Sequence, residues 1–136
     1  MQNYEKTFQD SYRRAVGTGS YNQAFITRFH DLLIERSGAI ASMFRQIDIS
    51  AQRTMLHDSL NLLVDFFHDR RVTPQIEQIA LLYSRVQKKV AQDLYATLVD
   101  ALVDTVKEFD PEFNEEVGMA WRLVLAPGIT FLQLRC

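Results

Sequence analysis

The sequence predicts an all-α protein of about six or seven helices joined by short connections. Apolar residues recur every three or four positions along most of the chain, which is the spacing of one helical face. No segment shows the sustained alternation of apolar and polar residues that is typical of a strand. The chain has 136 residues, of which 47% are hydrophobic, and this suits one domain over residues 1–136 with a single core.

The composition narrows the classes of partner. The formal net charge is −2 and no block of like charge occurs, which argues against a nucleic-acid or anionic-membrane surface. The single cysteine, Cys136, cannot form an internal disulfide, and no cysteine–histidine pattern predicts a zinc site. The first ten residues lack the apolar stretch of a secretory signal, and no apolar run reaches the roughly 18 residues of a membrane span. We therefore expect a cytoplasmic protein that contacts neither nucleic acid nor membrane.

The first expected helix covers residues 4–16. Tyr4, Phe8 and Tyr12 stand four residues apart, so they share one face of a helix. Gly17 follows at a position where glycine commonly ends a helix. The segment is therefore expected to be an amphipathic helix with an aromatic inner face.

Two further long helices are expected in the first half of the chain, separated by a short corner. Ser20 is a suitable N-cap for a helix over residues 21–36. Residues 39–44 are too few for a full helix, so we expect a single turn there. Ser50 can cap the next helix, over residues 51–67.

The next expected helix, over residues 74–88, carries an inward tyrosine. Thr73 is a good N-cap, and Pro74 suits the first helical position, where its missing N–H costs nothing. Ile79 and Tyr83 are four residues apart on one face, so the phenol is expected to point into the protein. A buried phenol needs a partner for its hydroxyl. A protein group, a water molecule or a metal ion could each supply that partner.

Two more helices are expected to complete the chain. A long apolar stripe predicts a helix over residues 92–109, and Asn114 can cap the last helix. Trp121 belongs to the buried face of that last helix. Pro127 is expected to kink the helix before it continues to about residue 132.

Two polar side chains share apolar helical faces and are candidates for a binding site. His30 follows Ile26 by four residues, so it is either a core-edge histidine bonded to a backbone carbonyl or a polar group that looks into a pocket. Gln52 precedes Leu56 by four residues, so it is either solvated or a donor that hangs over a pocket. No hydrolase or transferase motif accompanies them, and we predict no enzymatic activity.

The order and spacing of these features resemble the globin family, and most closely the single-domain haemoglobin-like globins of bacteria. The resemblance covers about residues 20 to 132. The segments that carry it are RFHDLL (28–33), MF (43–44), QRTML (52–56), IALLYSR (79–85), DLY (93–95), EEVGMAWR (115–122) and LAPGITF (125–131).

The resemblance implies a haem pocket between the helices expected over residues 51–67 and 74–88. Phe44 matches the phenylalanine that packs flat on haem, and Gln52 matches the distal residue that hydrogen-bonds a bound ligand. Leu56 matches the apolar residue beside that ligand. His30 falls where bacterial globins usually have a tyrosine that donates to bound oxygen.

Tyr83 falls where the family has its proximal histidine, the iron ligand, with Ile79 on the same face of the pocket. Ligation by Tyr83 would need the phenolate, and ionising a phenol of pKa about 10 at neutral pH costs roughly 4 kcal/mol. Ferric iron offsets this cost better than ferrous iron, as the tyrosinate of catalase illustrates. The resemblance therefore implies a ferric haem that senses a small diatomic ligand or does redox chemistry, rather than an oxygen carrier. His30 and His57 are less favoured as the iron ligand.

The same tyrosine leaves a second interpretation open. In that interpretation no haem is bound, and the hydroxyl of Tyr83 meets a side chain or a water molecule. The chain is then a globin-fold sensory or protein-interaction module, with a homodimer as one form that it can take.

Overall fold

The computed structural model describes residues 3–17, 22–45, 47–83 and 88–135, with the side chains at positions 79, 82, 83, 88–93 and 135 left outside the description. Helices make up nearly all of these residues, and none of them forms a strand. This confirms the predicted all-α class. The seven helices of the described chain are α1 (Tyr4–Ala15), α2 (Gln23–Arg36), α3 (Gly38–Phe44), α4 (Ile49–Asp69), α5 (Pro74–Tyr83), α6 (Lys88–Phe109) and α7 (Glu115–Arg135).

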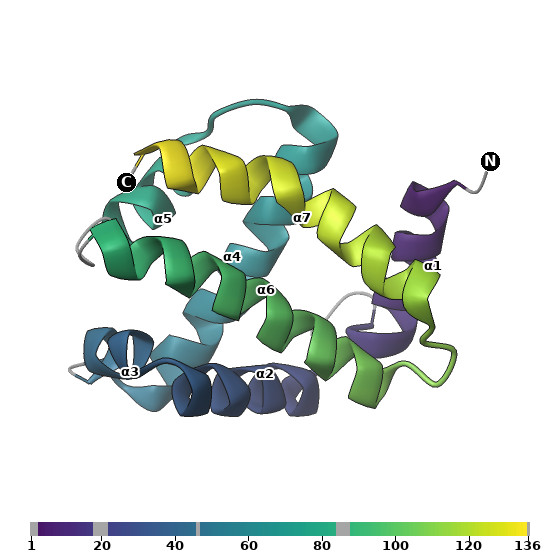
Figure 1. The fold of residues 1–136 in the computed structure, drawn as a ribbon, viewed down its shortest axis with the longest axis horizontal. Helices are drawn as coiled ribbons and strands as arrows, with labels where there is room; N and C mark the ends of the chain where they lie inside the picture. Colours follow the sequence, from purple (N-terminus) through teal and green to yellow (C-terminus); the bar gives the residue numbers. More distant parts are fainter. Residues whose placement is uncertain (1–2, 18–21, 46, 84–87, 136) are drawn as a thin grey trace.

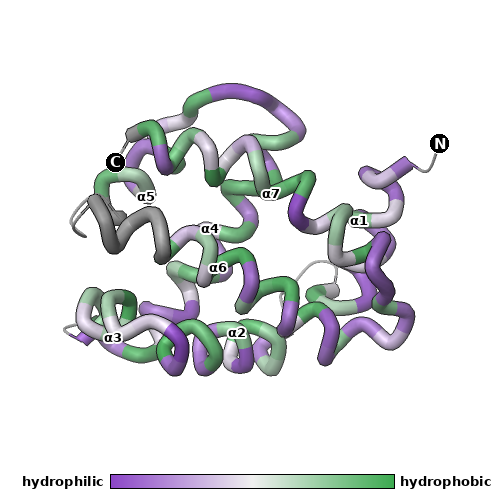
Figure 2. Tube along the Cα trace, viewed as in Figure 1, coloured by the Kyte–Doolittle hydropathy of each residue, from purple (hydrophilic) through white to green (hydrophobic). Residues whose placement is uncertain are grey.

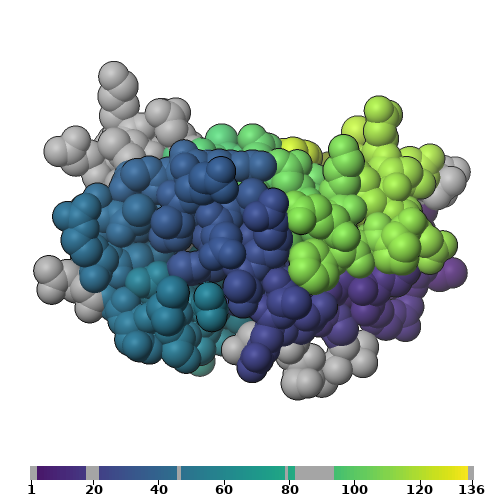
Figure 3. Space-filling model, turned by 90° about the horizontal axis from the view of Figure 1, so that it is seen from below, coloured from purple at the N-terminus to yellow at the C-terminus, as the bar shows by residue number. Residues whose placement is uncertain are grey.

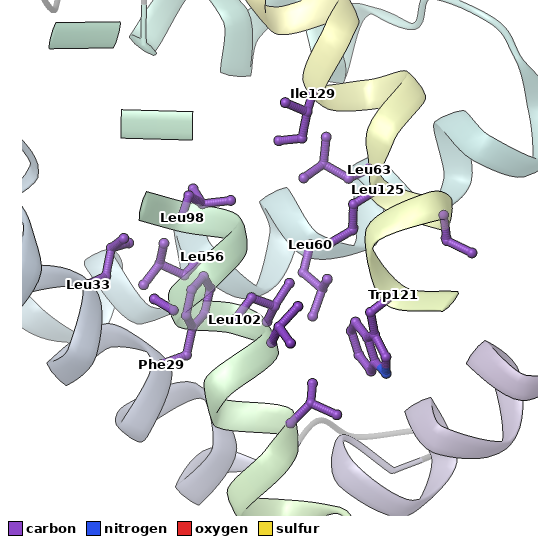
Figure 4. Close-up of a cluster of buried hydrophobic side chains, with 14 of the residues drawn as sticks. Phe29, Leu33, Leu56, Leu60, Leu63, Leu98, Leu102, Trp121, Leu125 and Ile129 are labelled. Atoms are coloured by element: carbon purple, nitrogen blue, oxygen red, sulfur yellow. The ribbon is translucent and has the colours of Figure 1, made fainter. Parts of the chain in front are cut away.

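The helices cross one another around a single core (Figure 1). The C-terminal helix α7 packs against α1, α4 and α6, while α2 packs against α3, α4 and α6. Helices α4 and α6 therefore contact both groups, and the core fills the space where the groups meet. The labelled core residues in Figure 4 are Phe29 and Leu33 from α2, Leu56, Leu60 and Leu63 from α4, Leu98 and Leu102 from α6, and Trp121, Leu125 and Ile129 from α7.

Helix α7 is hydrophobic along most of its length, as Figure 2 shows. By length and hydropathy alone, Glu115–Leu134 would be long and apolar enough to cross a membrane, which the sequence analysis did not expect. Trp121, Val124 and Leu125 of this helix have no exposed surface, because the neighbouring helices cover them. Core helices of globular proteins pass the same test, so the observation carries little weight for a membrane location.

The N-caps of α2 and α4 differ from those expected. Asn22 caps α2 through two backbone N–H groups of its first turn, whereas Ser20 lies outside the described residues. Asp48 caps α4 in the same way, so the expectation that Ser50 would cap this helix was wrong. A carboxylate accepts from two amides at once and also interacts favourably with the positive end of the helix dipole. These two interactions explain why Asp48, rather than Ser50, caps the helix.

Two more boundaries differ, and two caps are as expected. Ser37 Oγ accepts from the Ile40 N–H at 3.2 Å, and this cap makes α3 a seven-residue helix where a single turn was expected. Helix α6 begins at Lys88, four residues before the expected start. The caps at Thr73 and Asn114 are confirmed, because their side-chain oxygens accept from backbone N–H groups at 3.2 and 2.9 Å.

Helix α7 continues through Pro127 as one helix and approaches α4 closely just beyond it. A Cβ atom added at Gly128 would lie 2.5 Å from Leu63 Cδ2 and 3.4 Å from Leu63 Cα. Leu63 is only 3% exposed, so its side chain has little room to move away. The glycine therefore sets how near the two helices come.

A buried carboxylate joins α1 to the corner between α6 and α7. Asp110 Oδ2 accepts from Ser11 Oγ at 2.6 Å, and Asp110 Oδ1 accepts from Arg14 Nε at 2.6 Å. Ser11 Oγ in turn accepts from Trp121 Nε1 at 2.9 Å. Burial alone would raise the pKa of Asp110, but the hydrogen bonds from Arg14, Ser11 and the Glu112 N–H hold that pKa below its ordinary value.

We expect Asp110→Asn to lower the free energy of unfolding by about 2 kcal/mol at neutral pH, because it replaces charge-assisted hydrogen bonds by neutral ones. A lowered carboxyl pKa contributes stability that is fully present above the unfolded pKa of about 3.9 and is lost as the pH falls through the folded pKa. The difference between the wild type and the variant should therefore shrink in acid. Urea unfolding at neutral and acid pH measures it. Asp100→Asn removes the exposed ion pair with Arg122 and serves as the control, with an expected loss below about 1 kcal/mol.

We expect Gly128→Ala to lower the free energy of unfolding by about 1 kcal/mol. Overpacking against Leu63 costs about 1–3 kcal/mol, and the better helix propensity of alanine offsets about 1 kcal/mol of this. Gly38→Ala is the matched control, because nothing lies within 4 Å of a Cβ atom at that position. The urea midpoints of the two variants give the comparison, and a Gly128→Ala protein as stable as the wild type would contradict the close approach.

Candidate functional site

Three of the predicted site residues are in contact where α2, α3 and α4 meet. His30 lies on α2, Phe44 ends α3 and Gln52 lies in the second turn of α4. The distance from His30 Nε2 to Gln52 Oε1 is 2.6 Å. The rings of His30 and Phe44 stack with centroids 6.1 Å apart and planes 20° from parallel. Leu56 is one turn further along α4 and belongs to the hydrophobic core.

The amide of Gln52 is occupied by the protein itself. Gln52 Nε2 donates to the carbonyl oxygens of Phe44 at 2.8 Å and Ile47 at 2.7 Å. The last carbonyls of a helix lack partners within it, so a side-chain donor from α4 satisfies the end of α3. With both amide hydrogens engaged, Gln52 can donate to a bound ligand only by giving up one of these bonds.

The orientation of Gln52 determines which nitrogen of His30 carries the proton. Because the NH₂ group of Gln52 faces two carbonyls, its oxygen faces the imidazole, and His30 Nε2 must be the donor. In the neutral ring, His30 Nδ1 then carries a lone pair. This buried atom has no hydrogen-bond partner among the described residues, and Asp31 Oδ1 lies 3.7 Å from it. It is a buried acceptor that no described residue uses.

The described residues do not fit a haem in their present arrangement. Side chains that flank a haem would show exposed surface in a structure of the protein alone, yet Phe44 and Leu56 are each 1% exposed. Close packing of this kind leaves no void next to them for a porphyrin. Four cavities of about 170 to 300 Å³ do occur, but other residues line them.

The other two predicted site residues, Ile79 and Tyr83, are placed by their backbone alone. Tyr83 is the last described residue of α5, and Ile79 lies one turn before it. Both side chains fall outside the described part of the structure, so the inward orientation of the phenol and its role as a metal ligand stay predictions. Thr73 and Pro74 start the helix as expected.

The sequence analysis did not find the carbonyl oxygens of Phe44 and Ile47 as partners of Gln52. Backbone carbonyls have no sequence signature, so only the four-residue length of the connection between α3 and α4 could have pointed to them. A corner that short brings the end of α3 next to the start of α4. His30 is buried, as its spacing predicts, but it contacts the amide oxygen of Gln52 rather than the backbone carbonyl that one of the two interpretations expected.

The comparisons with known proteins bear on the fold. No model of a known protein family and no curated protein matches this chain. The chain is similar to a protein from Pseudomonas aeruginosa PAO1, whose crystal structure is described as structurally highly homologous to a human hemoglobin. The TM-score is 0.79, with 23% sequence identity over 98% of each chain. The fold is that of a globin. At this level of identity the likeness shows the fold alone, and it confirms the predicted globin-like arrangement.

We expect Gln52→Leu to lower the free energy of unfolding by about 2–4 kcal/mol. The substitution leaves the His30 Nε2–H group and the Ile47 carbonyl without their partner, and a buried unsatisfied group costs about 1–3 kcal/mol. Gln78→Leu on the exposed side of α5 is the control and should change stability by less than about 0.5 kcal/mol. Equal urea midpoints for the two variants would argue that Gln52 is solvated rather than engaged.

Proposed function

We propose that this chain is a globin-fold sensory or protein-interaction module that holds no resident haem. The observation that carries the proposal is the packing of the positions that would face the porphyrin. Phe44 and Leu56 are already covered by protein atoms, and Gln52 is engaged by the corner between α3 and α4. If the interior holds no cofactor, the protein acts through contacts that its outer surface makes with a partner.

Several further properties belong to this proposal. We expect no enzymatic role. The proposal also includes a cytoplasmic location, with a homodimer as one form that the chain can take. Tyr83 is then an ordinary aromatic residue in the position where a haem globin would need a histidine.

A second candidate is a ferric-haem protein that senses a small diatomic ligand or does redox chemistry. Tyr83 would bind the iron, Ile79 and Phe44 would line the pocket, and the haem would supply the ligand-binding metal. The unpartnered Nδ1 of His30 favours this candidate, because a buried lone pair near the expected distal side could accept a hydrogen bond. So does the description of the Pseudomonas protein as homologous to hemoglobin. Phe44 and Leu56 would both have to move to admit the porphyrin.

Haem titration separates the two candidates. We expect ferric haem added to the purified protein to give no saturable Soret band, because Phe44 and Leu56 are packed against other side chains where the porphyrin would lie. If the ferric-haem candidate holds instead, Tyr83→His is expected to gain affinity for ferrous haem, since an imidazole ligates ferrous iron better than a phenol does. Unchanged spectra in that variant would indicate that position 83 does not face the pocket.

A Soret band that saturates at one haem per chain in the wild type would overturn the haem-free proposal. Tyr83→Phe then identifies the ligand, because it keeps the ring and removes only the hydroxyl. Loss of the band in Tyr83→Phe would establish the tyrosine-ligated candidate. Retention of the band in Tyr83→Phe, with loss in His30→Ala or His57→Ala, would place the iron on a histidine instead.

A further inference from the structure

A small cavity between the beginnings of α2 and α4 lies outside the candidate site. Its volume is about 170 Å³, and both helices supply its walls. In the space-filling view of Figure 3, α2 and α3 occupy the middle of the visible face, with α4 beside them. The lining residues are Gln23, Ile26 and Thr27 from α2 and Ile49, Ser50 and Arg53 from α4.

The guanidinium of Arg53 is an uncompensated charge in this cavity. Arg53 is partly buried, and its Nε atom is closed off from solvent without a hydrogen-bond partner. Within the described part of the chain, no ion pair or hydrogen bond reaches any atom of its side chain. Partial removal of a charge from water is unfavourable unless an opposite charge or a hydrogen bond compensates for it. The cavity therefore favours a negatively charged occupant.

The other polar side chains of the cavity are also uncommitted. Gln23, Thr27 and Ser50 make no side-chain hydrogen bond to any described residue. This contrasts with Gln52, one position before Arg53, whose amide is fully engaged. Two hydroxyls, an amide and a guanidinium thus line one space, and no described residue accepts from their side-chain donors, although solvent reaches Gln23 and Ser50.

Asp48 is the acidic residue nearest in sequence to the cavity wall formed by α4. Its carboxylate is turned to the backbone N–H groups of Ser50 and Ala51, at 3.1 and 3.4 Å, rather than to Arg53. Arg28, the closest basic residue on α2, is paired with Glu108 on the far side of that helix. Arg53 is therefore the one unpaired charge that the described residues direct to this space.

We propose that this cavity binds a phosphate group, as inorganic phosphate or as the phosphate of a small metabolite. A guanidinium recognises phosphate oxygens through charge-assisted hydrogen bonds, and the hydroxyls of Thr27 and Ser50 are placed on two different helices to reach other oxygens. A tetrahedral oxyanion uses donors from several directions, whereas a planar carboxylate uses only two oxygens. The volume of about 170 Å³ is many times what a single water molecule needs, which is enough for such a group.

Titration of the full chain with sodium phosphate tests this proposal. The binding is followed by amide resonances at a constant ionic strength that chloride maintains. We expect saturable shifts at residues 23–27 and 49–53, with sulfate binding similarly and acetate more weakly. Arg53→Gln should weaken phosphate binding at least tenfold, and Ser50→Ala should weaken it several-fold. Arg45→Gln is the control, because Arg45 is exposed and lies outside the cavity.

Several results would contradict the phosphate site. Unchanged phosphate affinity in Arg53→Gln, equal weakening in Arg45→Gln, or no saturable binding to the wild type would each overturn the proposal. Acetate binding as tightly as phosphate would replace the phosphate group by a carboxylate and would overturn the assignment of the ligand. If Arg53→Gln is unstable, Ser50→Ala alone decides, since it removes one hydroxyl and keeps the charge. A bound metabolite is distinguished from inorganic phosphate by mass spectrometry of the small molecules released from the protein as purified. None of these results depends on whether haem binds.

Discussion

The side chain of Gln52 is the constraint on which the arrangement of the candidate site depends. One amide group bridges three helices, because its oxygen faces the imidazole of α2 while its nitrogen holds two carbonyls at the corner after α3. Each partner is buried or nearly so, and an unsatisfied buried group is costly. The amide therefore fixes the position of α4 relative to α3 and also fixes the tautomer of His30.

Under the proposed function, a globin-like fold forms without a haem pocket. The fold needs only that helices carry apolar stripes and cross in the right order, and the core between α2, α4, α6 and α7 meets that need. A haem pocket also needs space and a free donor on its distal side. In this chain Phe44 and Leu56 are packed against other side chains, and the corner carbonyls engage the amide hydrogens of Gln52.

The sequence was sufficient to predict where the helices lie along the chain. It was insufficient to predict the hydrogen bonds between them. Apolar periodicity is local, so the order of the helices could be predicted, as could the caps at Thr73 and Asn114. The start of a helix was harder to predict where two residues that can cap it stand two positions apart, as Asp48 and Ser50 do. The inward position of His30 followed from its spacing. Its bond to Gln52 could not be predicted, because it depends on how a four-residue corner places backbone carbonyls. For Tyr83, the side-chain orientation is still an expectation.

The link between α1 and Asp110 has a consequence for the way this protein is made. Ser11 and Asp110 stand 99 positions apart, so this link cannot form until almost the whole chain has been synthesised, whereas the bond from Tyr12 to Asn61 can form earlier. At about 5–20 residues per second, a ribosome needs roughly 5–20 seconds to cover that distance. During this interval Phe8 lacks Trp121, the aromatic partner against which it packs in the folded protein. The final docking of α1 onto α7 is therefore a late event in folding.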